Sequence, residues 1–157
     1  MVDAASEPAT PRIALAYWTT FAAYLREKEA TFQIGRPQPL LWNLFPIGRR
    51  GCGINATINI NRQRIGVGLH VIDDVEKKIF HELLAQKESI EEEFGEPLDW
   101  GLPERKATLI TLYKNLINPA DYNLYPEFHA WMLNKLEMSQ HVLASRVLAL
   151  PLRGDDA

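Results

Sequence analysis

Arginines concentrate in one segment of the chain, and their side chains are suited to holding a phosphate group. Residues 30–72 contain five arginines and no acidic residue, whereas residues 73–96 contain nine acidic residues and three lysines. The two segments therefore carry +5 and −6 in a protein whose formal net charge is −3. A local basic surface of this kind can contact phosphate or an acidic partner although the whole molecule is mildly acidic.

Polar and apolar residues alternate through residues 52–61, and the alternation resumes from residue 65 to residue 71. Period-two alternation predicts an antiparallel hairpin with one face on the core and one face towards solvent. The polar face would carry donor-rich side chains beside glycines that leave the sheet bare. The candidate ligand or phosphate contacts on it and at its ends are Arg49, Arg50, Arg62, Arg64, Asn55, Asn59, Asn61 and His70. The alternative interpretation is an ordinary solvated face of an antiparallel sheet.

No pattern of catalytic or metal-ligating residues is present in the sequence. There is no HExxH, paired CxxC, EF-hand, GxSxG, P-loop or Rossmann glycine pattern. We therefore expect no metal, no cofactor and no catalytic residue, and we leave an enzyme of unrecognised type centred on His70 as an open alternative. Cys52 falls on the apolar side of its strand, where a buried thiol is expected.

The elements that would position these residues follow the order α-β-β-β-α-β-β-α. Thr10 and Pro11 predict the start of a first helix, and a short strand is expected over residues 40–47 before the hairpin. Asp73 or Asp74 is expected to cap a second helix that ends at Gly95, and Asp73 and Glu76 have the spacing of a capping box. A second hairpin over residues 98–113 and a last helix over residues 126–149 complete an α+β fold. The helices would cover one face of a mainly antiparallel sheet, in a single two-layer domain.

The length and composition fit one domain over residues 12–150, with tails at residues 1–11 and 151–157 that we expect to be disordered. A single cysteine is typical of a protein in the reducing cytoplasm. No apolar stretch is long enough to span a bilayer, so no membrane contact is expected. The four tryptophans, Trp18, Trp42, Trp100 and Trp131, are expected mainly in the core, with Trp100 partly exposed.

Three segments of the sequence carry a family resemblance, namely Leu84 to Trp100, Leu102 to Ala107 and Glu127 to Trp131. They resemble a bacterial family known as a domain of unknown function, family 4268, and the resemblance extends over residues 18–150. In that family the domain often follows a restriction-type nuclease domain, which implies a nucleic-acid-processing context. The family has no established activity, so the resemblance assigns no catalytic residue.

The order of elements also resembles the core of restriction-like nucleases. Those enzymes need acidic residues on the second and third strands to hold Mg²⁺ and a lysine to polarise the attacking water. The equivalent segments, residues 51–61 and 64–72, contain no aspartate, glutamate or lysine. This resemblance therefore allows only a degenerate nuclease-like scaffold.

Two function hypotheses of different classes follow. The first is a non-catalytic binding or accessory module that contacts nucleic acid through its basic rim and acts with nucleic-acid-processing or defence proteins. The second is a protein-interaction or homodimerisation module in which acidic residues, such as those of the run Glu91 to Glu93, pair with the arginines within the fold or between subunits. Salt-sensitive binding of oligonucleotides would favour the first.

Overall fold

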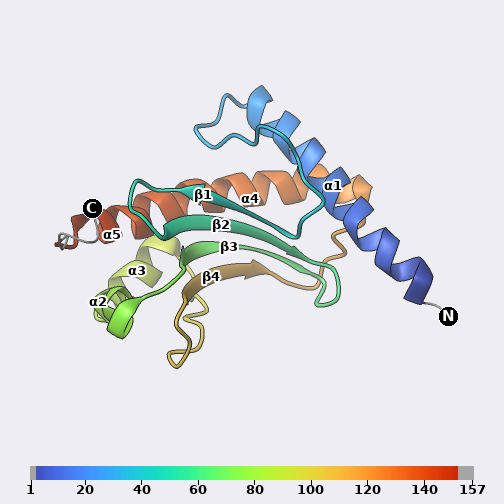
Figure 1. Ribbon diagram of the computed structural model, residues 1–157. Helices are drawn as coiled ribbons and strands as arrows, with labels where there is room; N and C mark the ends of the chain where they lie inside the picture. The colour runs from blue at the N-terminus through green and yellow to red at the C-terminus, as the bar shows by residue number, and fades with distance from the viewer. Residues whose placement is uncertain (1–2, 152–157) are drawn as a thin grey trace.

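The computed structural model describes residues 3–151 and contains a four-stranded antiparallel sheet with helices packed against one face (Figure 1). The sheet order is β1-β2-β3-β4, so every strand lies beside the strand that precedes it in the chain. The helices and strands are α1 (Asp3–Glu27), β1 (Trp42–Pro46), β2 (Cys52–Asn59), β3 (Arg64–Val71), η1 (Val75–Lys77), α2 (Lys78–Leu84), α3 (Lys87–Phe94), β4 (Thr108–Lys114), η2 (Tyr122–Leu124), α4 (Tyr125–Ser139), the π-helical η3 (Gln140–Ala144) and α5 (Ser145–Ala149). The α+β class and the mainly antiparallel sheet are confirmed.

The predicted hairpin is the central pair of strands, β2 and β3. The alternate residues Cys52, Ile54, Ala56 and Ile58 of β2 are buried, as are Ile65, Val67, Leu69 and Val71 of β3. They pack with α1 and α4, whose aromatic residues include the fully buried Tyr17, Trp18, Phe21 and Phe128. The opposite face of the sheet, which we call the open face, therefore carries the polar half of the alternation. Figure 1 shows α4 passing along one side of the sheet and α1 crossing near the N-terminal end of α4.

The expected second helix is divided into η1, α2 and α3. Glu76 and Lys77 have φ of 57° and 52°, in the left-handed region, so a helix cannot run through them. Of the two predicted caps, Asp73 and Asp74, the structure uses Asp74, because its carboxylate accepts from the backbone N–H groups of Ile79 (3.0 Å) and Phe80 (2.8 Å). The capping box with Glu76 is therefore wrong.

Two further predictions of element boundaries differ from the structure. α1 begins at Asp3, so the helix start expected at Thr10 and Pro11 lies inside the helix. In the second hairpin only β4 is a full strand, and its expected partner contributes a single isolated bridge between Asp99 and Thr111. Residues 1–2 and 152–157 of the expected tails lie outside the described residues.

A buried histidine lies between α1 and α4. His129 is 4 % exposed, and the ring centroids of Tyr17, Phe21 and Tyr125 lie 5.0, 5.2 and 5.5 Å from its own. Its Nε2 lies 3.3 Å from Oγ1 of Thr20. Burial lowers the pKa of His129 to about 4, because the charged imidazolium is not solvated there.

This low pKa makes a testable contribution to acid unfolding. Below about pH 6.5 the unfolded chain binds a proton at His129 that the native state rejects, so stability is lost as the pH falls from about 6.5 towards 4. Between pH 7 and pH 5, the unfolding free energy of the wild-type chain should fall by about 1–2 kcal/mol more than that of His129→Leu, as measured by urea denaturation. Replacing the exposed His141 by glutamine is the matched control. An unchanged pH dependence in His129→Leu would contradict this assignment.

Candidate ligand-binding groove on the open face of the sheet

The open face contains a groove of about 610 Å³, which lies within the size range of ligand sites, roughly 300–1,000 Å³. We call it the sheet-face groove. It is lined from all four strands and adjoining turns by Leu41, Trp42, Leu44, Asn55, Thr57, Ile58, Asn59, Asn61, Arg64, His70, Ile72 and Tyr113. Five of the eight residues predicted as contacts, namely Asn55, Asn59, Asn61, Arg64 and His70, are thus brought together.

The strand register explains why aromatic and polar side chains share this groove. Trp42 of β1 pairs with Thr57 of β2, which pairs with Gly66 of β3, which pairs with Tyr113 of β4. These four residues form one row across the open face, with two rings flanking a hydroxyl and a bare glycine. Trp42 is 51 % exposed, so its expected place in the core is wrong.

Tyr113 and Arg64 form a stacked pair over the glycine of this row. A Cβ atom at Gly66 would lie 2.9 Å from the ring of Tyr113, so the ring rests directly against the sheet backbone. The guanidinium carbon of Arg64 lies 3.6 Å from the centroid of the same ring. This is cation–π geometry, which holds the guanidinium flat against the phenol ring.

The polar side chains of β2 differ in whether they form hydrogen bonds within the sheet and its turn. Oγ1 of Thr57 donates to the carbonyl of Gly66 at 3.4 Å. Oδ1 of Asn59 accepts from the N–H of Arg62 at 3.0 Å and so stabilises the turn of the hairpin. Oδ1 of Asn55 and Nε of Arg64 are buried and have no hydrogen-bond partner within residues 3–151, the part of the chain that the structure describes.

The electrostatics of the groove favour an anionic or electron-rich ligand. Its lining residues include Arg64 and no carboxylate. Burial lowers the pKa of His70, so this ring is uncharged at neutral pH and offers a neutral nitrogen. Arg62 is exposed in the turn beside Asn61, at the same end of the hairpin as Arg64.

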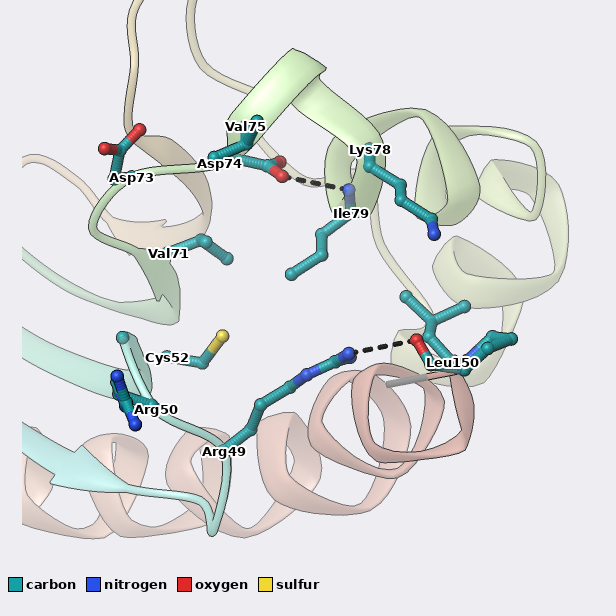
Figure 2. Close-up of a pocket in the computed structure, with 12 residues that line it drawn as sticks. Arg49, Arg50, Cys52, Val71, Asp73, Asp74, Val75, Lys78, Ile79 and Leu150 are labelled. Carbon is teal, nitrogen blue, oxygen red and sulfur yellow. Dashed lines mark hydrogen bonds between the residues drawn. The ribbon is translucent and has the colours of Figure 1, made fainter. Parts of the chain in front are cut away.

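Arg49 and Arg50 lie at a different place. They precede β2, at its opposite end from Arg62 and Arg64, and they line a smaller cavity of about 140 Å³ with Cys52 and Lys78 (Figure 2). Nη1 of Arg49 donates to the carbonyl of Val147 at 2.8 Å, so this guanidinium connects the start of β2 to α5. The arginines thus do not form one continuous rim.

The acidic run pairs with residues other than the arginines of the sheet. Glu93 accepts from Nη2 of Arg146 at 2.6 Å, which joins α3 to α5. Glu91 accepts from the backbone N–H of Leu98 at 2.9 Å and from Nε1 of Trp100 at 3.0 Å. Within the described residues, these contacts hold α3 to its neighbours.

Sequence reasoning missed the apolar and aromatic groove residues Leu41, Trp42, Leu44, Ile58, Ile72 and Tyr113. Aromatic and aliphatic side chains are usually buried, and that expectation concealed them. A signal was present, because pairing β1 with β2 places alternate residues of β1 on the same face as the asparagines.

In the described part of the chain, no cluster of three or more histidine, cysteine, aspartate or glutamate side chains could hold a metal ion. Within the same residues, no helix is long and apolar enough to cross a membrane.

Comparison with known proteins identifies a family. No curated protein and no solved structure is detectably similar to the chain. The family described as "Domain of unknown function (DUF4268)" matches residues 13–146, which include all four strands and α4. The chain therefore belongs to the DUF4268 family of domains of unknown function.

Proposed function

We propose that this chain is a non-catalytic binding module that holds single-stranded nucleic acid on the open face of its sheet. The observation that carries the proposal is the sheet-face groove, which combines an exposed indole, a stacked arginine–tyrosine pair and asparagine amides without a carboxylate. Aromatic rings on a sheet bind unpaired bases by stacking, and arginines beside them contact the phosphates.

The stacking surface is supplied chiefly by Trp42. Its ring is half-exposed at the edge of the sheet, in the same row as Tyr113. The guanidinium of Arg64 lies flat on Tyr113 and offers a second planar surface. Stacking of a base on such a surface contributes about 1–3 kcal/mol per base, which is enough for a few nucleotides to bind measurably.

The charges at one end of the groove suit a phosphate backbone. Arg64 lines the groove and Arg62 is exposed in the adjacent turn, only two residues away. A single strand can place a base on Trp42 while its phosphates reach these arginines. A duplex keeps its bases stacked inside the helix, so it cannot use Trp42 in this way.

The cellular setting is also a proposal. The resemblance to domains that accompany restriction-type nucleases supports a role beside nucleic-acid-processing or defence proteins. A single cysteine, which is buried, fits the reducing cytoplasm.

A second candidate function is self-association through the edge of the sheet. β1 is an edge strand. Its first residue, Trp42, is 51 % exposed, and Leu40 and Leu41, which precede it, are 44 % and 40 % exposed. Exposed edges with apolar side chains are templates for pairing with another strand. This candidate predicts a dimer that forms without nucleic acid and that Trp42→Lys prevents, as measured by sedimentation.

The test is a fluorescence-anisotropy titration with labelled single-stranded DNA and RNA of about ten nucleotides, compared with the matching duplex. We expect the single strands to bind more tightly than the duplex. With two arginine contacts, the affinity should fall about sevenfold between roughly 50 and 200 mM salt. Absence of binding to any single strand at low salt would contradict the proposed function.

A further inference from the structure

Two buried polar atoms that have no hydrogen-bond partner among the described residues belong to the sheet-face groove. They are the acceptor Oδ1 of Asn55 and the donor Nε of Arg64. Leaving a buried polar atom without a partner costs free energy, and most such atoms in native proteins are paired. A ligand that supplies a donor and an acceptor at these positions would remove that cost.

Asn55 differs in this respect from its polar neighbours on β2. The hydroxyl of Thr57 donates to the carbonyl of Gly66, and Oδ1 of Asn59 accepts from the N–H of Arg62 in the turn. Asn55 lies in the row that joins Leu44, Gly68 and Thr111, where its neighbour on β3 has no side chain. Among the described residues, Oδ1 of Asn55 therefore accepts no hydrogen bond, unlike Oδ1 of Asn59.

Asn55 lies on the open face in the row next to the one that carries Trp42 and Tyr113. It lies two residues along β2 from Thr57, so its row is about 7 Å from the row of Trp42 and Tyr113. Trp42 lies on β1, the strand next to β2, so a base that stacks on its ring can present its edge, rather than its flat face, towards Asn55 in the next row. The amide of Asn55 then faces hydrogen-bonding groups of the base.

Resting on the proposed function, we propose that Asn55 reads the hydrogen-bonding edge of one unpaired base, so that binding discriminates between bases. An asparagine amide offers an acceptor and a donor side by side, which matches a donor and an acceptor on neighbouring positions of a base edge. Nε of Arg64 donates to an oxygen of the same nucleotide. Asn55 is therefore a specificity-determining residue of the site.

The test compares homopolymeric single strands of adenine, cytosine and thymine nucleotides, each of about eight residues, by anisotropy. For the wild-type chain we expect the dissociation constants of the tightest-binding and the weakest-binding strand to differ by at least about tenfold. Asn55→Ala should reduce this spread to less than about threefold while the salt dependence stays. The control Asn134→Ala, which changes an exposed asparagine of α4, should leave the spread unchanged.

A second variant covers the case in which Asn55→Ala does not fold. Asn55→Asp keeps the size and the acceptor but loses the donor, so it should change the order of preference among the three strands. Equal affinities of the wild-type chain for all three strands would overturn the inference and leave the proposed function standing. An unchanged spread in both Asn55 variants would also overturn it. Absence of binding to all three strands would instead contradict the proposed function itself.

Discussion

Gly68→Ala is expected to lower the unfolding free energy by about 3 kcal/mol or more, which is a large share of the stability of a small domain. A Cβ atom at this position would collide with the carbonyl oxygen of Ile110 and would lie 2.6 Å from Cα of Thr111. Both atoms belong to the backbone of β4, so no side-chain rotation relieves the collision.

β4 also has no room to move away from the added carbon. Thr111 pairs with Gly68 on one side and forms two backbone hydrogen bonds with Asp99 on the other, at 2.8 and 2.9 Å. Separating β4 from β3 would therefore break the ladder or displace the segment at Asp99. Because the core face of β4 carries the buried Ile110, such a shift would also disturb the packing.

Urea denaturation of two other glycine variants provides the comparison. At Gly66 the nearest atoms are side-chain atoms of Thr57 and Tyr113, each at 2.9 Å, so Gly66→Ala should cost about 1 kcal/mol. A Cβ atom at Gly35 would have no atom of the described residues within 4 Å, so Gly35→Ala should change stability by less than about 0.5 kcal/mol. Equal unfolding free energies of Gly68→Ala and Gly35→Ala would contradict the close contact between Gly68 and the backbone of β4.

The hairpin could be predicted from the sequence because its alternation is local. Each apolar residue of β2 from Cys52 to Ile58 is buried, since period-two alternation must turn alternate side chains to one face. The last helix was also predictable from its apolar stripe, including the buried Phe128 and Leu136. The choice of Asp74 over Asp73 as the cap was not predictable, because the Asp74 carboxylate also accepts from Thr108 of the distant strand β4. The left-handed conformation of Glu76 was not predicted either.

The candidate site was predicted in part for the same reason. Asn55 and Arg64 follow from the alternation, whereas Tyr113 depends on β4 pairing with β3, a contact between distant parts of the chain. The division of the arginines was predictable from geometry. The residues on either side of β2 are separated by its length, about 23 Å from Cys52 to Asn59, so Arg49 and Arg62 cannot share one site.

The central claim is that the arginine end of the sheet-face groove contacts phosphate, and the most direct test removes both arginines. Arg62 is exposed and Arg64 lies on Tyr113. Each phosphate contact that is lost should cost about 1 kcal/mol, so Arg62→Ala/Arg64→Ala should bind single strands about 30-fold more weakly. The dependence of the affinity on salt should also nearly disappear, because counterion release scales with the number of contacts.

The control for this titration is Arg26→Ala/Arg105→Ala, which removes the same charge at exposed positions of α1 and the loop before β4. Its affinity should stay within about twofold of the wild-type chain, apart from the general effect of net charge. Thermal melts of both double variants establish that they are folded. A 30-fold loss confined to Arg62→Ala/Arg64→Ala is the result we predict. Equal affinity and equal salt dependence in the two double variants would contradict the assignment of the open face as a nucleic-acid-binding surface.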